Sequence, residues 1–208
     1  MLTVARTRHV VEATLEPGAA KGQMAHFNSF IRIPFLFLRQ MVSPLPALDP
    51  LDTDTIQLRV WPNDIDFNLH LNNARHLSVM DYGRVRLLAR GGVLKPILEA
   101  RWVPVVGDVW ITYRRSLPLW ARYTLATRLV CWDERWFYME QTFTGYEGLV
   151  AIGWVKGALR DKSGVIAPQR VMDLVRPGMV SPVVPEALHT LNALARDKLR
   201  GASQPPAS

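Results

Sequence analysis

The chain has 208 residues, 49% of them hydrophobic, and a formal charge of +7 from 25 basic and 18 acidic side chains. This size and apolar content are enough for one folded domain with extensions, and the single cysteine, Cys131, excludes an internal disulfide and a multi-cysteine metal cluster. The positive charge favours anionic partners, but it is spread along the chain without a basic tract, so nucleic acid is not an expected partner.

We expect residues 1–52 to form an N-terminal extension, with an amphipathic segment at 27–42 and a proline-rich connector at 44–50. Two arginines and a proline interrupt the apolar positions of 27–42, which leaves a run shorter than the roughly 20 residues that span a bilayer. This segment is expected either to cap the domain or to make peripheral contact with a membrane surface. The N-terminus lacks the pattern of a secretory signal, which favours a cytoplasmic protein.

The first predicted elements are a strand and a long helix joined by a polar loop. Apolar and polar residues alternate over 55–61, which predicts a half-buried strand. Residues 74–90 contain no proline and follow a plausible N-cap at Asn72 or Asn73, so they predict the main helix. Its apolar residues occupy several sides, which indicates that it is covered on more than one side. The main apolar stripe consists of Leu77, Met80, Leu87 and Leu88.

A series of β-favouring segments with short turn signals between them follows the helix. These segments are 97–105, 109–115, 122–132, 136–143 and 149–159, with Gly107-Asp108 as the first turn signal. One long helix followed by neighbouring strands predicts an α+β domain over 53–162, in which an antiparallel β-sheet wraps around one central helix. Residues 163–208 are expected to be a C-terminal extension with a helix at 185–200 and a disordered tail.

The loop before the main helix is the densest group of polar side chains in the chain. Its spacing is Asp-x-Asp-x-x-x-His-x-Asn-Asn-Ala over 64–74, with Asp81-x-x-Arg84 further along the helix. A carboxylate at a helix N-terminus can act as base or nucleophile while first-turn amides stabilise an oxyanion, which points to carbonyl chemistry. The spacing resembles the signature of hotdog-fold acyl-CoA thioesterases of the 4-hydroxybenzoyl-CoA thioesterase type, over about residues 55–159. Leu69 in place of a glycine and His76 in place of an aromatic resemble the thioesterase superfamily member 6 branch.

This resemblance implies a hotdog fold and the hydrolysis of acyl-CoA or related acyl thioesters. Asp64 matches the family's reacting aspartate, which serves as base or nucleophile. His70 is expected either to orient the substrate or to be a hydrogen-bonded structural histidine. Asp66 matches the second acid and is expected to brace the loop.

The resemblance also assigns roles around the helix start and along the helix. The backbone amides of Leu71, Asn72 and Asn73 are expected to form the oxyanion hole. Asp81 and Arg84 lie one helical turn apart, so an intrahelical ion pair is expected, and support of an active site in a neighbouring subunit is the alternative.

Coenzyme A is expected only as part of the substrate, with no separate cofactor and no metal. Arg114 and Arg115, at the end of a strand, are candidates for contact with its phosphates, although exposed arginines need no such role. The resemblance implies a homodimer or a higher homo-oligomer. The alternative function is a noncatalytic hotdog that binds acyl groups or a protein partner, because a bulky Leu69 would restrict access to the helix start.

Overall fold

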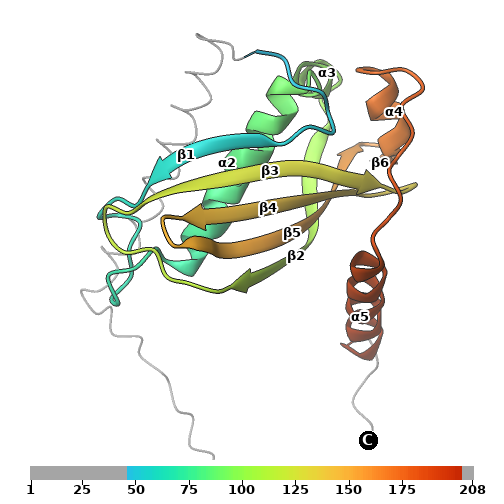
Figure 1. The fold of residues 1–208 in the computed structure, drawn as a ribbon. Coiled ribbons are helices and arrows are strands. Elements are labelled where there is room, and N and C mark those ends of the chain that lie inside the picture. The colour runs from blue at the N-terminus through green and yellow to red at the C-terminus, as the bar shows by residue number, and fades with distance from the viewer. Residues whose placement is uncertain (1–45, 203–208) are drawn as a thin grey trace, which may run out of the picture.

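The structure, a computed structural model, describes residues 46–202, and one antiparallel sheet curves around the long helix α2 (Figure 1). The expected amphipathic segment at 27–42 and the expected disordered tail after 202 lie outside the described residues. The elements are β1 (Asp54–Arg59), α2 (Asn73–Arg90), α3 (Leu94–Glu99), β2 (Val103–Tyr113), β3 (Arg122–Trp132), β4 (Phe137–Gly145), β5 (Gly148–Asp161), β6 (Gly164–Ile166), α4 (Pro168–Asp173) and α5 (Glu186–Ala202).

The strands lie in the order β1-β3-β4-β5-β2, and each neighbouring pair is antiparallel. This confirms the α+β prediction of an antiparallel sheet around one central helix. Strand β6 pairs with the end of β5 through Leu159 and Ile166, so the sheet continues beyond residue 162. Strands β1 and β2 are the two edges of the main sheet.

The helix at Leu94–Glu99 and the continuous strand β2 differ from the sequence prediction. A strand was expected at 97–105, but a short apolar run does not distinguish a strand from a helix. The predicted turn at Gly107 is a β-bulge inside β2, where the register with β5 shifts between Val106 and Asp108. A Cβ at Gly107 would lie 2.7 Å from the Trp136 ring, so glycine allows the ring to cover the bulge.

Helix α2 begins at the N-cap Asn72, whose side chain accepts a hydrogen bond from the Ala74 N–H at 2.8 Å. Its buried residues are His76, Met80, Gly83 and Leu87, a spacing that places them on one face toward the sheet. The predicted stripe was wrong at Leu77, which is 42% exposed. Met80 and Leu87 of the predicted stripe face the sheet, and in the first turns His76 is buried instead of Leu77.

The helix touches the sheet most closely at Gly83. A Cβ there would lie 2.6 Å from Thr127 Oγ1 and 2.9 Å from Gln141 Nε2. The fully buried Gln141 side chain donates to the Met80 carbonyl at 2.9 Å and to Thr127 Oγ1 at 3.0 Å, and its oxygen accepts a bond from Arg84 at 2.9 Å. One amide thus joins α2, β3 and β4.

A buried ion cluster attaches β1 to the C-terminal half of α2. The Asp54 carboxylate is fully buried and accepts a bond from Arg86 Nε at 2.8 Å. Arg90 pairs with the other carboxylate oxygen. Two cations on one buried carboxylate satisfy its charge inside the protein, where removal of either partner would leave a costly unpaired ion.

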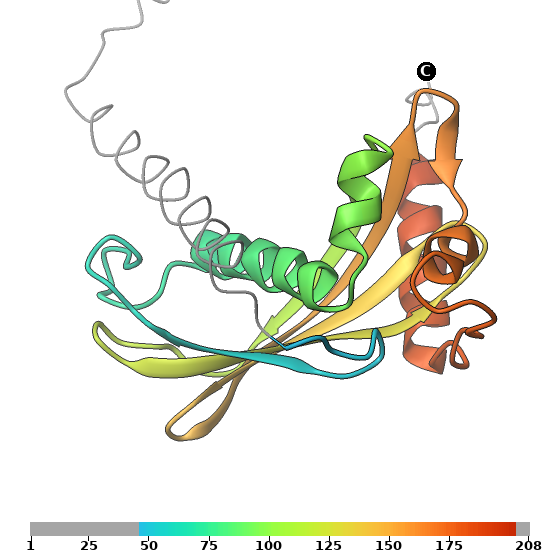
Figure 2. The same ribbon diagram turned by 90° about the horizontal axis from the view of Figure 1, so that it is seen from above.

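Helix α5 lies at one end of the sheet, on the face opposite α2 (Figure 2). Val155 packs with Met80 in the core, whereas the next residue, Lys156, points the other way and donates to Asn192 of α5 at 2.8 Å. Cys131 is buried beside Leu188 of α5, and burial, with the charge of Asp133, raises the pKa of its thiol to about 11. Cys131 is therefore a core residue. None of the helices within 46–202 is long and apolar enough to cross a bilayer.

Gly83→Ala tests the close packing of helix on sheet. Alanine favours helices by about 1 kcal/mol over glycine, but its Cβ would overlap Thr127 and Gln141. We expect a net loss of about 1–3 kcal/mol in the free energy of unfolding by urea denaturation. Gly201→Ala in α5, where a Cβ meets nothing within 4 Å, is the matched control and should be neutral or slightly stabilising. An equal response of the two variants would contradict the close contact.

Candidate active site

The loop between β1 and α2 is held against a second loop that precedes β3. The Leu71 N–H donates to the Leu117 carbonyl at 2.8 Å, and the Leu119 N–H donates to the Leu69 carbonyl at 3.3 Å. The rings of Trp61 and Trp120 meet edge to face, with centroids 5.4 Å apart. The two loops therefore support each other beside the start of α2.

Asp64 is a buried carboxylate near the first turn of α2. Its side chain accepts the Trp61 N–H at 3.1 Å and lies 4.0 Å from Arg75 Nε, and the residue is only 4% exposed. Arg75 also donates to the Asn63 carbonyl at 3.2 Å. Asp64 thus lies against the first turn of α2 through Arg75, and it also anchors the loop.

Asp66 lies closer to the surface than Asp64. One of its carboxylate oxygens accepts the Asn68 N–H at 2.8 Å, which forms a local turn. The structure shows no partner for its other oxygen among residues 46–202, and the residue is half-buried. The Asp66 N–H donates to the His70 carbonyl at 3.0 Å, so the loop brings both residues to the same turn. His70 is also half-buried.

The expected oxyanion hole is corrected at two of its three amides. The Leu71 N–H is bonded to Leu117, and the Asn72 N–H donates to the Asp64 carbonyl at 2.9 Å, so neither is available to a substrate. Capping by Asn72 uses the Ala74 N–H. Within the described residues, the Asn73 N–H is the amide at the helix start that has no acceptor.

Leu69 has a backbone φ of 61°, the left-handed region that glycine adopts without strain. This explains why a glycine suits the same position in the motif. The Leu69 side chain is 62% exposed, so it does not fill the interior beside the helix. The reason for expecting a noncatalytic protein, a leucine that blocks access, is correspondingly weaker.

His76 is a buried histidine in the first turns of α2. Its Nδ1 lies 3.3 Å from the Asn72 carbonyl, and a carbonyl can only accept, so Nδ1 carries the proton. The rings of Tyr113 and Phe143 contact it edge to face, and its Nε2 has no partner among the described residues. Burial lowers the pKa of His76, an effect that the bond to Asn72 partly offsets. The imidazole is therefore held neutral.

Asp81 and Arg84 form the expected intrahelical ion pair. The Arg84 side chain is only 11% exposed, and burial lowers its pKa while the charge of Asp81 opposes that shift. Its bond to Gln141 crosses from the helix to β4. Arg84 is thus a buried cation that faces the interior, away from the loop at the helix start.

Strand β2 ends beside the start of α2, because the Tyr113 hydroxyl lies 3.4 Å from the Asn73 carbonyl. Arg114 and Arg115 follow directly and are exposed. Arg115 donates to the Leu149 carbonyl at 3.3 Å and lies 4.0 Å from Glu147, whereas no side-chain partner is seen for Arg114 among residues 46–202. Within the same residues no group of three His, Cys, Asp or Glu side chains is arranged to hold a metal ion.

The sequence did not reveal three residues that shape this region. Arg75 pairs with Asp64 and Tyr113 contacts Asn73, but neither Arg75 nor Tyr113 is itself a position that the motif defines. Gln141 lies 57 residues from Arg84 along the chain. The alternating pattern of its strand would have placed Gln141 on the inner face, where a polar residue is unusual enough to signal a bonded role.

His76→Phe tests the buried neutral imidazole. A lowered folded-state pKa means that the unfolded chain binds more protons below about pH 6.5, so stability due to His76 is lost as pH falls from that value. Phenylalanine keeps the ring contacts and removes the unpartnered nitrogen. We measure the free energy of unfolding of both proteins by urea denaturation. We expect the value of the variant minus that of the wild type to increase as the pH falls from 7.5 to about 5. His189→Gln on the exposed face of α5 controls for loss of a histidine, and a constant difference would contradict the assignment.

Comparisons with known proteins agree with this geometry. The family model of the Thioesterase-like superfamily matches residues 60–185, which include the loop and α2. Protein THEM6 of Xenopus laevis is 32% identical over 160 residues, covering 76% of this chain and 75% of that protein. Protein THEM6 of Danio rerio is 34% identical over 132 residues, covering 62% of this chain and 63% of that protein.

Solved structures show the same architecture. YbaW, a probable thioesterase from Escherichia coli, aligns with a TM-score of 0.55 at 24% identity, over 61% of this chain and 98% of that one. BH1999 gentisyl-coenzyme A thioesterase aligns with a TM-score of 0.53 at 14% identity, over 57% and 98%. The chain therefore has the hotdog fold and belongs to the Thioesterase-like superfamily, in the branch of the THEM6 proteins.

Proposed function

We propose that this protein hydrolyses acyl-CoA or related acyl thioesters. Membership of a thioesterase-like family supports the reaction class. The observation that carries the proposal is the loop itself. Two backbone bonds, Asp66 N–H to His70 and Asn72 N–H to Asp64, tie both aspartates to the segment that leads into α2, where the Asn73 amide is open. A carboxylate and an unpaired helix amide are the two groups that thioester cleavage needs.

The different burial of the two aspartates suits them to different roles in the proposed reaction. Asp64 is buried, faces Arg75 and accepts a backbone amide, which suits a brace. Asp66 is half-buried and keeps one carboxylate oxygen without a partner among residues 46–202, which suits a group that must reach the substrate. This reverses the roles that the motif assigned to them, and we therefore favour Asp66 as the reacting carboxylate.

In the proposed reaction the thioester oxygen accepts the Asn73 N–H at the helix start. As base, Asp66 takes a proton from a water molecule while the water oxygen forms a bond to the thioester carbon. The tetrahedral intermediate then collapses and the carbon–sulfur bond breaks. Asp66 returns its proton to the departing thiolate, so the thiol and the free acid leave and the carboxylate is restored. As nucleophile, the same carboxylate would form a transient anhydride that water cleaves. Neither route requires a cofactor other than the coenzyme A of the substrate.

A pair of isosteric substitutions tests this division. With a panel of short, long and aryl acyl-CoAs, we expect Asp66→Asn to lower kcat by about 10²–10⁴-fold without loss of Tm. Asp64→Asn should lower Tm because it removes the charge that faces Arg75. Asp52→Asn, at an exposed position in the turn before β1, is the matched control. Full activity in the Asp66 variant, with activity lost in a well-folded Asp64 variant, would restore the assignment made from the motif.

We also propose that Arg114 contacts the phosphates of coenzyme A. It is exposed and follows Tyr113, which reaches the helix start. Arg115 is already engaged with Leu149 and Glu147 and is expected to contribute less. Arg114→Ala should raise KM for an acyl-CoA by about three- to tenfold with little change in kcat. The same substitution should not affect an acyl-pantetheine, which lacks the nucleotide phosphates, and an equal effect on both would rule out this role.

A homodimer is proposed to form along β2, an edge of the main sheet. Val103, Val106 and Tyr113 are exposed on this strand, and an edge of this kind is open to pairing with a second copy. Sedimentation velocity measures the assembly state, and a monomer at all concentrations would exclude the dimer.

A further inference from the structure

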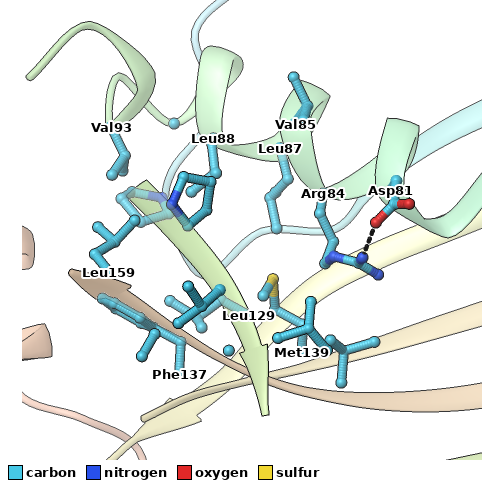
Figure 3. Close-up of a pocket in the computed structure, with 18 of the residues that line it drawn as sticks. Asp81, Arg84, Val85, Leu87, Leu88, Val93, Leu129, Phe137, Met139 and Leu159 are labelled. Atoms are coloured by element: carbon cyan, nitrogen blue, oxygen red, sulfur yellow. Dashed lines mark hydrogen bonds and ion pairs between the residues drawn. The ribbon is translucent and has the colours of Figure 1, made fainter. Parts of the chain in front are cut away.

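A cavity of about 290 Å³ lies between the C-terminal half of α2 and the inner face of the sheet (Figure 3). Its lining runs along the helix from Asp81 to Gly91, about 15 Å at 1.5 Å per residue. Leu129, Phe137 and Met139 close it from the sheet side. No residue of the loop at 61–73 lines it, so it is separate from the candidate active site.

The size of the cavity suits one aliphatic chain. An engineered apolar cavity of about 150 Å³ takes up benzene, a ring of six carbons. A cavity of about 290 Å³ therefore has room for about a dozen carbon atoms. Its elongated lining favours an extended chain over a compact ring, and Met139 and Met172 supply adaptable side chains against such a chain.

Among residues 46–202, the charged residues that line this cavity are Asp81 and Arg84, and they lie together at one end. Figure 3 shows the Arg84 guanidinium directed toward the sheet from α2, with Asp81 beside it and the labelled leucines further along. The Asp81 side chain is 59% exposed and can be hydrated, whereas that of Arg84 is largely buried. Of the five N–H groups of Arg84, one is seen to donate to Gln141 and one to Asp81, so donors remain for another acceptor.

We propose that this cavity binds a linear fatty acid of about ten to twelve carbons, with its carboxylate on Arg84 and its tail between α2 and the sheet. A carboxylate matches the planar guanidinium in two parallel hydrogen bonds, and the dry surroundings strengthen them. The tail is stabilised by the burial of its methylenes against the apolar lining. The site goes beyond the proposed hydrolysis, because binding of a free acid involves no turnover.

Isothermal titration calorimetry of the full chain with dodecanoate tests this site. We expect one molecule of dodecanoate per chain, and binding of dodecanol weaker by about tenfold or more, since an alcohol cannot pair with Arg84. Dodecyltrimethylammonium has the same tail with the opposite charge and should bind more weakly still. Equal binding of the three ligands would refute the role of Arg84, and no binding of dodecanoate at millimolar concentration would refute the site.

Two variants test separately the contacts of the tail and those of the carboxylate. At Gly157 a Cβ would make ordinary contacts, at 3.4 Å or more, with Val105 and Met139, so Gly157→Leu fills the cavity without displacing the backbone. We expect this variant to lose dodecanoate binding and to keep or raise Tm. Arg84→Met should weaken binding by about 10- to 100-fold. Arg128→Met is the matched control, because it removes an exposed arginine of β3 that pairs with Glu140. This variant should bind dodecanoate as wild type does.

A titration with dodecanoyl-CoA tests whether the cavity binds the acyl chain of a thioester as well as the free acid. The Asp66→Asn variant allows this titration without hydrolysis if the proposed function holds, and dodecanoate binding to that variant should equal that of wild type. Dodecanoate binding that survives in a folded Gly157→Leu variant would overturn the proposal. Loss of hydrolysis with intact dodecanoate binding, or the reverse, shows which of the two proposals has failed.

Discussion

The buried amide of Gln141 is the contact on which the rest of the fold depends. It bonds the Met80 carbonyl and Thr127, so it requires α2 to lie within hydrogen-bonding distance of β3 and β4. Gly83 makes that distance possible, because any side chain there would occupy the space of the amide. Inside a dry core an unpaired amide costs roughly 1–3 kcal/mol, so these contacts form together or not at all. They set the distance between α2 and the sheet, and this distance positions the residues at both ends of the helix.

Helix α2 carries two chemically different regions at its two ends. Its start is polar, with Asp64, Asp66 and an open amide at Asn73. Its C-terminal half lies over an apolar cavity that has a guanidinium at one end. Gln141 connects the two regions, since it accepts a bond from Arg84 and also bonds the carbonyl of Met80, one turn earlier. Arg84 and the Met80 carbonyl are thus joined through one side chain, which fixes the middle of the helix on β4.

Much of the fold could be predicted because it follows from local patterns. The strand at 122–132 and the helix at 74–90 were placed within a residue of their observed bounds, since alternation and capping are encoded in neighbouring residues. The residues around Gly107 were misread as a turn, because the need for glycine there comes from the distant Trp136 ring that covers the bulge. The motif located the site, but the use of the Leu71 and Asn72 amides depends on Leu117 and on the shape of the loop. Contacts between distant segments also form the cavity, and no local sequence pattern predicts it.

Helix α5 has a consequence for how copies of this chain can assemble. It lies on the outer surface of the sheet, where Leu188 is buried and Asn192 bonds both Lys156 and the Tyr138 hydroxyl. A sheet whose back is occupied in this way cannot stack on the back of another without first releasing the helix and exposing these polar groups.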